Sequence, residues 1–185
     1  MTLLVNKNNL FNEIMIKDFE FVEYENINEE LVLVEKEAFR HFEMLKAHLN
    51  VEGIKIDIID GYRSLEKQEN MFLEYYKKYG MDNAIDKIDM PGLSEHHTGQ
   101  AIDIILYKDN KWILDRNKLE LEEDIFCKIH NVLKYFGFIL RYPKGKENIT
   151  GHYYEPWHIR YVGEDVSMEI DEDTLEEYIE KSIKS

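Results

Sequence analysis

Residues 54–60 read IKIDIID, and this short stretch decides the fold class. Isoleucine occupies positions 54, 56 and 58, while Lys55 and Asp57 fall between them. Because successive side chains of a strand point to opposite faces, this alternation predicts a half-buried β-strand. Gly61 follows the run and is expected to end the strand.

Helices are predicted on both sides of this strand from apolar residues that recur every three or four positions. The first runs over 28–49 with Asn28 as its cap, and the second follows Ser64, ends at Gly80 and covers 64–79. Two more are expected over 121–136 and 173–183, strands over 101–107, 138–142 and 157–162, and a long loop over 81–100. The pattern indicates a single α+β domain, residues 1–185, with an antiparallel β-sheet and helices packed on it.

The charge of the chain excludes several function classes. Asp and Glu number 38 against 23 Lys and Arg, which gives a formal net charge of −15. Nucleic acids and anionic membranes need a basic surface, so neither is an expected partner. The one cysteine, Cys127, permits no internal disulfide, and no signal peptide is visible, so we expect a cytoplasmic protein.

Two segments gather the residues that carry chemistry. Residues 92–103 read GLSEHHTGQAID, so Asp103 interrupts an apolar strand and needs a partner, such as a metal, that offsets its burial. Residues 155–158 read EPWH and place Glu155 three residues before a histidine. Catalytic zinc sites use three protein ligands and an open position. We therefore expect one Zn²⁺ ion on His96, Asp103 and His158, with Glu155 as general base. A capping or ion-pair role for Asp103, and a chance E-x-x-H spacing, are the simpler alternatives.

These segments resemble a known family. Residues 94–103 are similar to the S-x-H-x-x-G-x-A-x-D signature of the VanY-like D-alanyl-D-alanine zinc metallopeptidases, EPWH to their second signature, and DGYRS at 60–64 to a third motif. The likeness extends from about Leu4 to Gly163, and the VanXY type of vancomycin-resistance enzyme is the most similar subgroup. It implies a hedgehog/D,D-peptidase-like fold and hydrolysis of D-Ala-D-Ala, of the terminal D-Ala of the muramyl pentapeptide precursor, or of both.

The same resemblance suggests roles for further residues. Arg63 stabilises the oxyanion or clamps a substrate carboxylate, and the sequence does not separate the two. The residues expected to bind substrate are Ser94, Gln68, Asp60, Tyr154 and Trp157, although Trp157 is expected chiefly to pack beneath His158.

The remaining histidines have plainer interpretations. His41, His48 and His130 lie on predicted helices and are expected at the surface or its boundary. His97 and His152 depart from the VanXY pattern, and we expect them to be spectators rather than residues that shape the pocket.

Other functions are compatible with the same motifs. An L,D-carboxypeptidase or an L-alanyl-D-glutamate endopeptidase would share the zinc ligands, and only a comparison of substrates separates them from a D,D-peptidase. A zinc module that only binds is the third possibility, and the presence of Glu155 argues against it.

Overall fold

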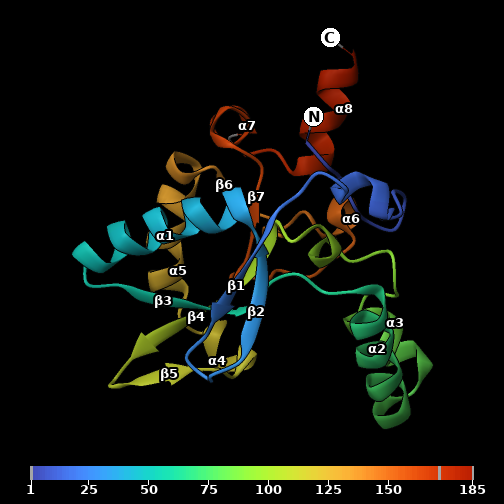
Figure 1. The fold of residues 1–185 in the computed structure, drawn as a ribbon, viewed down its shortest axis with the longest axis horizontal. Coiled ribbons are helices and arrows are strands. Elements are labelled where there is room, and N and C mark those ends of the chain that lie inside the picture. The colour runs from blue at the N-terminus through green and yellow to red at the C-terminus, as the bar shows by residue number, and fades with distance from the viewer. Residues whose placement is uncertain (1, 171, 185) are drawn as a thin grey trace.

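The computed structural model describes residues 2–170 and 172–184, which form an α+β fold around an antiparallel sheet (Figure 1). The five-stranded sheet has the order β3-β4-β7-β6, and β5 also pairs with β4. Its strands are β3 (Lys55–Asp60), β4 (Ala101–Lys108), β5 (Lys111–Ile113), β6 (Phe138–Leu140) and β7 (His158–Tyr161). A separate hairpin consists of β1 (Phe21–Glu25) and β2 (Leu31–Glu35).

The helices surround this sheet and close the chain. The longer ones are α1 (Lys36–Val51), α2 (Leu65–Tyr79), α5 (Glu123–Leu133) and α8 (Leu175–Lys184). The shorter ones are α3 (Met81–Lys87), α4 (Arg116–Leu119), α6 (Glu147–Thr150), α7 (Glu164–Ile170) and the 3₁₀ turns η1 (Glu13–Ile16), η2 (Glu95–Thr98) and η3 (Lys134–Phe136). None of the helices in the described ranges is long and apolar enough to cross a membrane.

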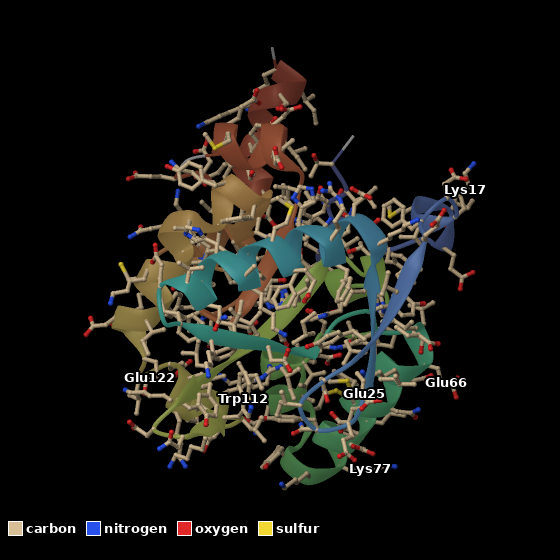
Figure 2. All side chains as sticks on the ribbon, turned by 60° about the vertical axis from the view of Figure 1, so that its left-hand side comes forward. Lys17, Glu25, Glu66, Lys77, Trp112 and Glu122 are labelled. Carbon is tan, nitrogen blue, oxygen red and sulfur yellow. The ribbon has the colours of Figure 1, made fainter. Side chains whose placement is uncertain are left out.

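The central strand β4 is buried from Ala101 to Leu106, so its polar member Asp103 lies inside the protein. Helices α1 and α5 pack their apolar sides into the same core as this strand, through residues such as Phe42 and Phe126. Charged side chains such as Lys17, Glu66 and Lys77 lie on the outside (Figure 2). The predicted antiparallel sheet with packed helices is therefore confirmed.

The first predicted helix was wrong over its first part. Residues 31–35 form strand β2, in which Val32 and Val34 are buried, and α1 begins only at Lys36. The carboxylate of Glu35, rather than Asn28, caps α1 by accepting from the amides of Glu37 and Ala38. Leu31, Val34 and Ala38 have helical spacing by coincidence, because a strand with alternating burial runs directly into a helix.

The predicted loop over 81–100 contains structure as well. Helix α3 packs against α2, and η2 precedes the central strand. The other predicted elements form within a few residues of the expected limits, and Ser64 and Gly80 flank α2 as expected.

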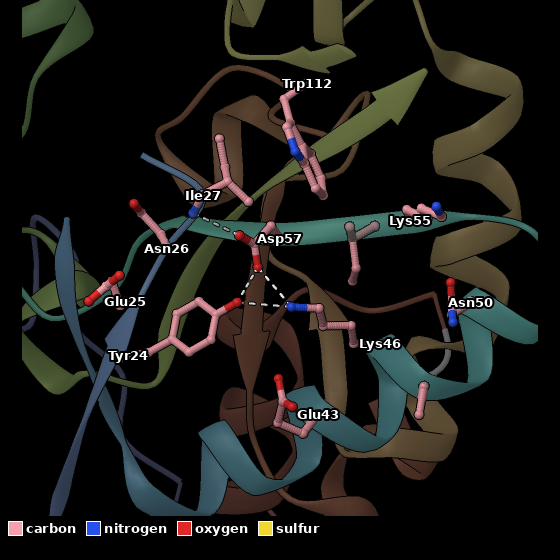
Figure 3. A pocket seen from close by; sticks show the side chains of 12 residues that line it. Tyr24, Glu25, Asn26, Ile27, Glu43, Lys46, Asn50, Lys55, Asp57 and Trp112 are labelled. Carbon is pink, nitrogen blue, oxygen red and sulfur yellow. Dashed lines mark hydrogen bonds and ion pairs between the residues drawn. The ribbon is translucent and has the colours of Figure 1, made fainter. Parts of the chain in front are cut away.

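A buried carboxylate fastens the hairpin to the sheet (Figure 3). Asp57 on β3 accepts from the hydroxyl of Tyr24, from Lys46 Nζ at 2.8 Å and from the amide of Ile27 at 3.1 Å. Tyr24, Ile27, Lys46 and Asp57 line a cavity of about 460 Å³. A buried charge is stable when it is paired and hydrogen-bonded, and Asp57 is both.

Candidate metal centre and active site

The register of the sheet brings the predicted site residues together. Asp60 on β3 lies opposite Asp103 on β4, and Asp103 lies opposite His158 on β7. A register irregularity between Ile58 and Asp60 sets the first of these pairs. Three residues that are far apart in sequence therefore form one row across three neighbouring strands.

His96 reaches the row from the turn η2, which directly precedes β4. Gly99 ends this turn with φ of 71°, a left-handed conformation that suits glycine. A Cβ atom on Gly99 would also lie 2.4 Å from a ring carbon of Phe21. This tight glycine turn allows His96 to approach Asp103 on the strand that follows.

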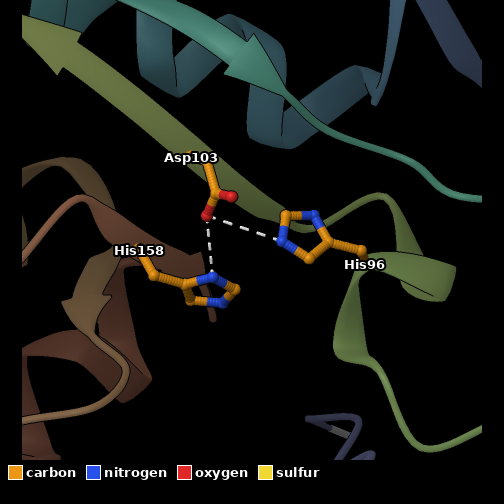
Figure 4. Close-up of side chains that lie close together, drawn as sticks. All are labelled: His96, Asp103 and His158. Atoms are coloured by element: carbon orange, nitrogen blue, oxygen red, sulfur yellow. Dashed lines mark hydrogen bonds and ion pairs between the residues drawn. The ribbon is translucent and has the colours of Figure 1, made fainter. Parts of the chain in front are cut away.

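His96, Asp103 and His158 converge on one point (Figure 4). One ligand atom from each lies within 4.8 Å of the others, and all three residues are buried. Oδ1 of Asp103 is 3.5 Å from Nε2 of His96 and 2.9 Å from Nδ1 of His158. Two imidazoles and one carboxylate are a donor set that suits zinc.

The other ring nitrogen of each histidine is already engaged. Nδ1 of His96 donates to the carbonyl oxygen of Gly61 at 2.7 Å, and Nε2 of His158 lies 3.0 Å from Oε1 of Glu95. In a neutral imidazole, an acceptor beside one nitrogen fixes the hydrogen on that nitrogen and leaves the lone pair on the other. The nitrogens that face Asp103 are therefore those free to bind a metal.

Burial and neighbouring charges shift the pKa of each candidate ligand. Burial opposes ionisation of Asp103, but His96, Arg116 and His158 outweigh it and hold its pKa well below the usual range. Burial and the neighbouring Arg63 lower the pKa of His96, which keeps that ring neutral. Burial also acts against the cationic form of His158, yet hydrogen bonds to Asp103 and Glu95 raise its pKa to about 9.

Glu155 is held beside this cluster by a turn. The amide of His158 donates to the carbonyl oxygen of Glu155 at 3.1 Å, and Oε2 of Glu155 lies 3.7 Å from Nδ1 of His158. The side chain is 26% exposed and lines a cavity of about 210 Å³ together with the three candidate ligands. Burial raises the pKa of Glu155 against the opposing effect of His158, which suits a group that takes up a proton and releases it again.

Arg63 is fixed by three acceptors. Its guanidinium donates to Asp60 Oδ2 at 2.9 Å, to Gln68 Oε1 at 3.3 Å and to Asp103 Oδ2 at 3.4 Å. Its side chain is only 8% exposed, and the residue lines the same cavity. The structure thus places a rigid positive charge beside Asp103.

The other predicted substrate-binding residues separate into two groups. Ser94 and Gln68 line the cavity, whereas Asp60 is not among the described residues that line it and contacts Arg63 instead. Tyr154 and Trp157 are not among the described residues that line it: Tyr154 lies under Lys144 Nζ, 4.7 Å from the ring centre, and Trp157 is 5% exposed and belongs to the core.

Two charged residues at the site were not predicted from the sequence. Arg116 at the start of α4 donates to Asp103 Oδ2 at 2.7 Å, and its guanidinium lies 5.3 Å from the ring centre of Trp157. Glu95 is buried beside His158 and pairs with Arg141 and Arg160. Arg116 belongs to no recognisable motif, so the sequence carries no signal for it. Glu95 lies within residues 92–103, where a charged residue in a buried segment is such a signal.

His97 forms hydrogen bonds with segments around the site, and His152 lines its cavity. His97 accepts from the amide of Gly92 at 3.0 Å and donates to the carbonyl oxygen of Arg63 at 2.7 Å, so it fastens the preceding loop. His152 lines the cavity and stacks on Tyr142 at 4.2 Å. His41 is buried at 3% exposure, so its expected surface position was wrong, while His48 and His130 lie at the boundary as expected.

A family model described as VanY, D-alanyl-D-alanine carboxypeptidase, matches residues 31–164. The bifunctional D-Ala-D-Ala dipeptidase and D-Ala-D-Ala carboxypeptidase VanXYC of Enterococcus gallinarum is 37% identical over 153 residues, which cover 80% of this chain and 77% of that protein. YodJ of Bacillus subtilis (strain 168) is 35% identical over 185 residues, and the alignment spans 92% of this chain but only 61% of YodJ.

Solved structures show the same fold. The vancomycin-resistance D,D-pentapeptidase VanY from a VanB-type cassette, solved as a variant with Zn(II), has a TM-score of 0.77 at 29% identity and covers 96% of this chain and 97% of its own. The LD-carboxypeptidase LdcB has a TM-score of 0.73 at 34% identity and covers 95% of this chain and 79% of its own.

Proposed function

Because the chain belongs to the VanY family of D-alanyl-D-alanine carboxypeptidases, we propose that residues 1–185 form one zinc-dependent D,D-peptidase domain. Its substrates are the dipeptide D-Ala-D-Ala, the peptidoglycan pentapeptide precursor that ends in D-Ala, or both. The observation that carries this proposal is the convergence of His96, Asp103 and His158 beside Glu155 in one cavity.

One Zn²⁺ ion is the proposed cofactor, held by these three side chains. The donor set fits it, because the carboxylate is ionised, His96 is neutral, and His158 presents a lone pair on Nδ1 once zinc displaces its proton. The related VanY structure that contains Zn(II) supports the same choice. Zinc, when bound, supplies a Lewis acid that lowers the pKa of water toward 7.

Glu155 is the proposed general base and general acid. Its carboxylate takes the proton from the attacking water and then delivers it to the leaving amine of D-alanine. Its half-buried position and raised pKa support both steps, since the carboxylate accepts the proton readily and the carboxylic acid then gives it up.

Arg63 supplies the fixed positive charge of the reaction. Because Asp60, Gln68 and Asp103 hold its guanidinium in place, Arg63 needs no reorganisation to stabilise negative charge on the substrate. That charge belongs to the tetrahedral oxyanion or to the substrate carboxylate, and both uses suit a carboxypeptidase.

Ser94, Gln68 and Asp60 are proposed to bind the ends of the substrate. Ser94 and Gln68 are supported by their place in the cavity, and Asp60 by its contact with Arg63. For Trp157 and Tyr154 we propose an indirect role: Trp157 packs under the guanidinium of Arg116, and Tyr154 borders the segment that contains Glu155.

An L,D-carboxypeptidase is the second candidate, because LdcB shares the fold at 34% identity. Both activities release D-alanine but from different substrates: a D,D-peptidase cleaves a D-Ala-D-Ala end, and an L,D-carboxypeptidase cleaves the tetrapeptide. We expect release of D-alanine from D-Ala-D-Ala or from the muramyl pentapeptide when both are assayed beside the tetrapeptide. Release from the tetrapeptide alone would establish the second candidate instead.

We propose that the protein works in the cytoplasm, where the nucleotide-linked precursor is made. Its only cysteine, Cys127, is exposed and free, which suits a reducing compartment. Fractionation of cells that produce the protein tests this, and recovery outside the cytoplasmic fraction would contradict it.

A further inference from the structure

Glu95 is a fully buried carboxylate that contacts a candidate metal ligand from behind. Its Oε1 lies 3.0 Å from Nε2 of His158, while Oε2 accepts from Arg141 Nε at 2.7 Å and from Arg160 Nη1 at 3.4 Å. The side chains of Glu95, Arg141 and Arg160 are all 0% exposed. Such a charged group in the interior is costly unless each member is paired, and each of these is.

We propose that Glu95 is a positioning residue for the zinc ligand His158, an inference that rests on the proposed zinc site. An ionised carboxylate only accepts hydrogen bonds, so Nε2 of His158 must carry hydrogen when it faces Glu95. The lone pair of a neutral His158 then lies on Nδ1, the nitrogen that faces Asp103 at 2.9 Å. Glu95 therefore selects the tautomer and the ring orientation that the metal needs, and its charge makes the ring a stronger donor.

The contact extends to the last helix of the chain. Arg141 donates through Nη1 and Nη2 to the two carboxylate oxygens of Glu176, at 2.9 and 2.6 Å, while its Nε holds Glu95. Glu176 belongs to α8, so this helix is joined to His158 by two successive ion pairs, through Arg141 to Glu95, and then by the contact between Glu95 and His158. Helix α8 thus helps to position a metal ligand although it supplies no ligand itself.

Arg160 holds Glu95 from the other side. It donates through Nη2 to the carbonyl oxygen of Leu3 at 2.9 Å and to Gln100 Oε1 at 2.9 Å, so its place does not depend on Glu95 alone. Glu95 consequently lies between two cations that are each anchored elsewhere, which restricts its carboxylate to one orientation.

The zinc affinity of the purified protein tests this inference. It is measured by competition with a chromophoric chelator at neutral pH. Glu95→Gln keeps the size of the side chain but removes its charge, and we expect it to weaken zinc binding by roughly 10- to 100-fold. Glu176→Gln should weaken binding less, because it acts through Arg141. Glu177→Gln is the matched control, since Glu177 is on the same helix but pairs with Lys146 at 3.0 Å, and it should leave the affinity unchanged.

A spectroscopic measurement separates positioning from a merely structural role. In the zinc-loaded protein, the Nε2 hydrogen of His158 should give a downfield nitrogen-bound proton signal, and Glu95→Gln should move that signal. Zinc binding by Glu95→Gln equal to that of the wild type, with an unmoved signal, would overturn the inference while leaving the proposed function intact.

Other outcomes are equally decisive. If Glu95→Gln does not fold, Glu176→Gln decides: weaker zinc binding than in Glu177→Gln supports the positioning role, and equal binding refutes it. If the wild-type protein itself binds no zinc, the proposed function fails first and this inference falls with it.

Discussion

Nδ1 of His96 donates to the carbonyl oxygen of Gly61 at 2.7 Å, so the residue that follows strand β3 orients the first of the proposed metal ligands. The amide of Arg63 also donates to the carbonyl oxygen of His96 at 3.1 Å. The DGYR segment therefore contributes to the site through its backbone as well as through the guanidinium of Arg63.

Gly61→Ala is expected to damage both stability and metal binding. A Cβ atom at this position would lie 2.4 Å from the carbonyl oxygen of Leu33 and 3.0 Å from side-chain carbons of Val32 and Val34. The backbone must move to relieve this overlap, at a cost of about 1–3 kcal/mol in the free energy of unfolding. Urea denaturation and zinc titration measure the two effects, and an unchanged zinc affinity would contradict the expected effect of the backbone shift on metal binding.

Glu155→Ala should abolish hydrolysis and leave zinc bound. The carboxylate transfers protons but is not one of the three proposed ligands, so we expect kcat to fall by about 10²- to 10⁴-fold. Metal content of the purified variant and its kcat on D-Ala-D-Ala measure the two properties. Glu74→Ala, at an exposed position on α2, is the control, and normal turnover by Glu155→Ala would refute the assignment.

Zinc binding should release about one proton at neutral pH. In the zinc-free protein Asp103 is ionised and His96 neutral, whereas His158 has a pKa raised to about 9 and carries a proton. Because only the neutral imidazole binds metal, zinc affinity should rise about tenfold per pH unit and level off above that pKa. Calorimetry in buffers of different ionisation enthalpy counts the protons, and a count of zero would contradict this protonation state.

Asp57→Asn should lower stability without affecting catalysis. An asparagine amide has a single acceptor oxygen and cannot replace all the hydrogen bonds that Asp57 accepts from Tyr24, Lys46 and the amide of Ile27, which leaves partly buried donors unpaired. We expect a loss of about 1–3 kcal/mol in the free energy of unfolding. Because none of these groups lines the cavity of the active site, kcat/KM should stay at the wild-type value, and a loss of activity in the folded variant would contradict this separation.

The sequence predicted the central part of the fold but missed its N-terminal hairpin. Strand 54–60 was readable because its isoleucines alternate, and α2 because Ser64 and Gly80 flank it. Strand β2 was taken for helix because its buried Val34 also matches the spacing of α1. Local patterns do not show where a strand passes directly into a helix. Here residues 31–35 form a strand because they pair with β1.

The site was predicted as far as its motifs extend. His96, Asp103, His158 and Glu155 follow from two short segments, and the sheet register brings those segments together. Arg116 and the Arg141–Glu176 pair reach the site only through tertiary contacts, so no spacing in the sequence could indicate them. His41 is predicted at the surface or its boundary from its place on a helix, yet it is buried and its ring centre lies 4.9 Å from that of Tyr161.

Release of D-alanine from D-Ala-D-Ala and from the muramyl pentapeptide tests most directly whether this chain is a zinc D,D-peptidase. The assay is run on the untreated protein, after chelation, and after zinc is added back. We expect chelation to remove the release of D-alanine and zinc to restore it. Full activity in metal-free protein, or no D-alanine from either substrate with zinc bound, would contradict the account.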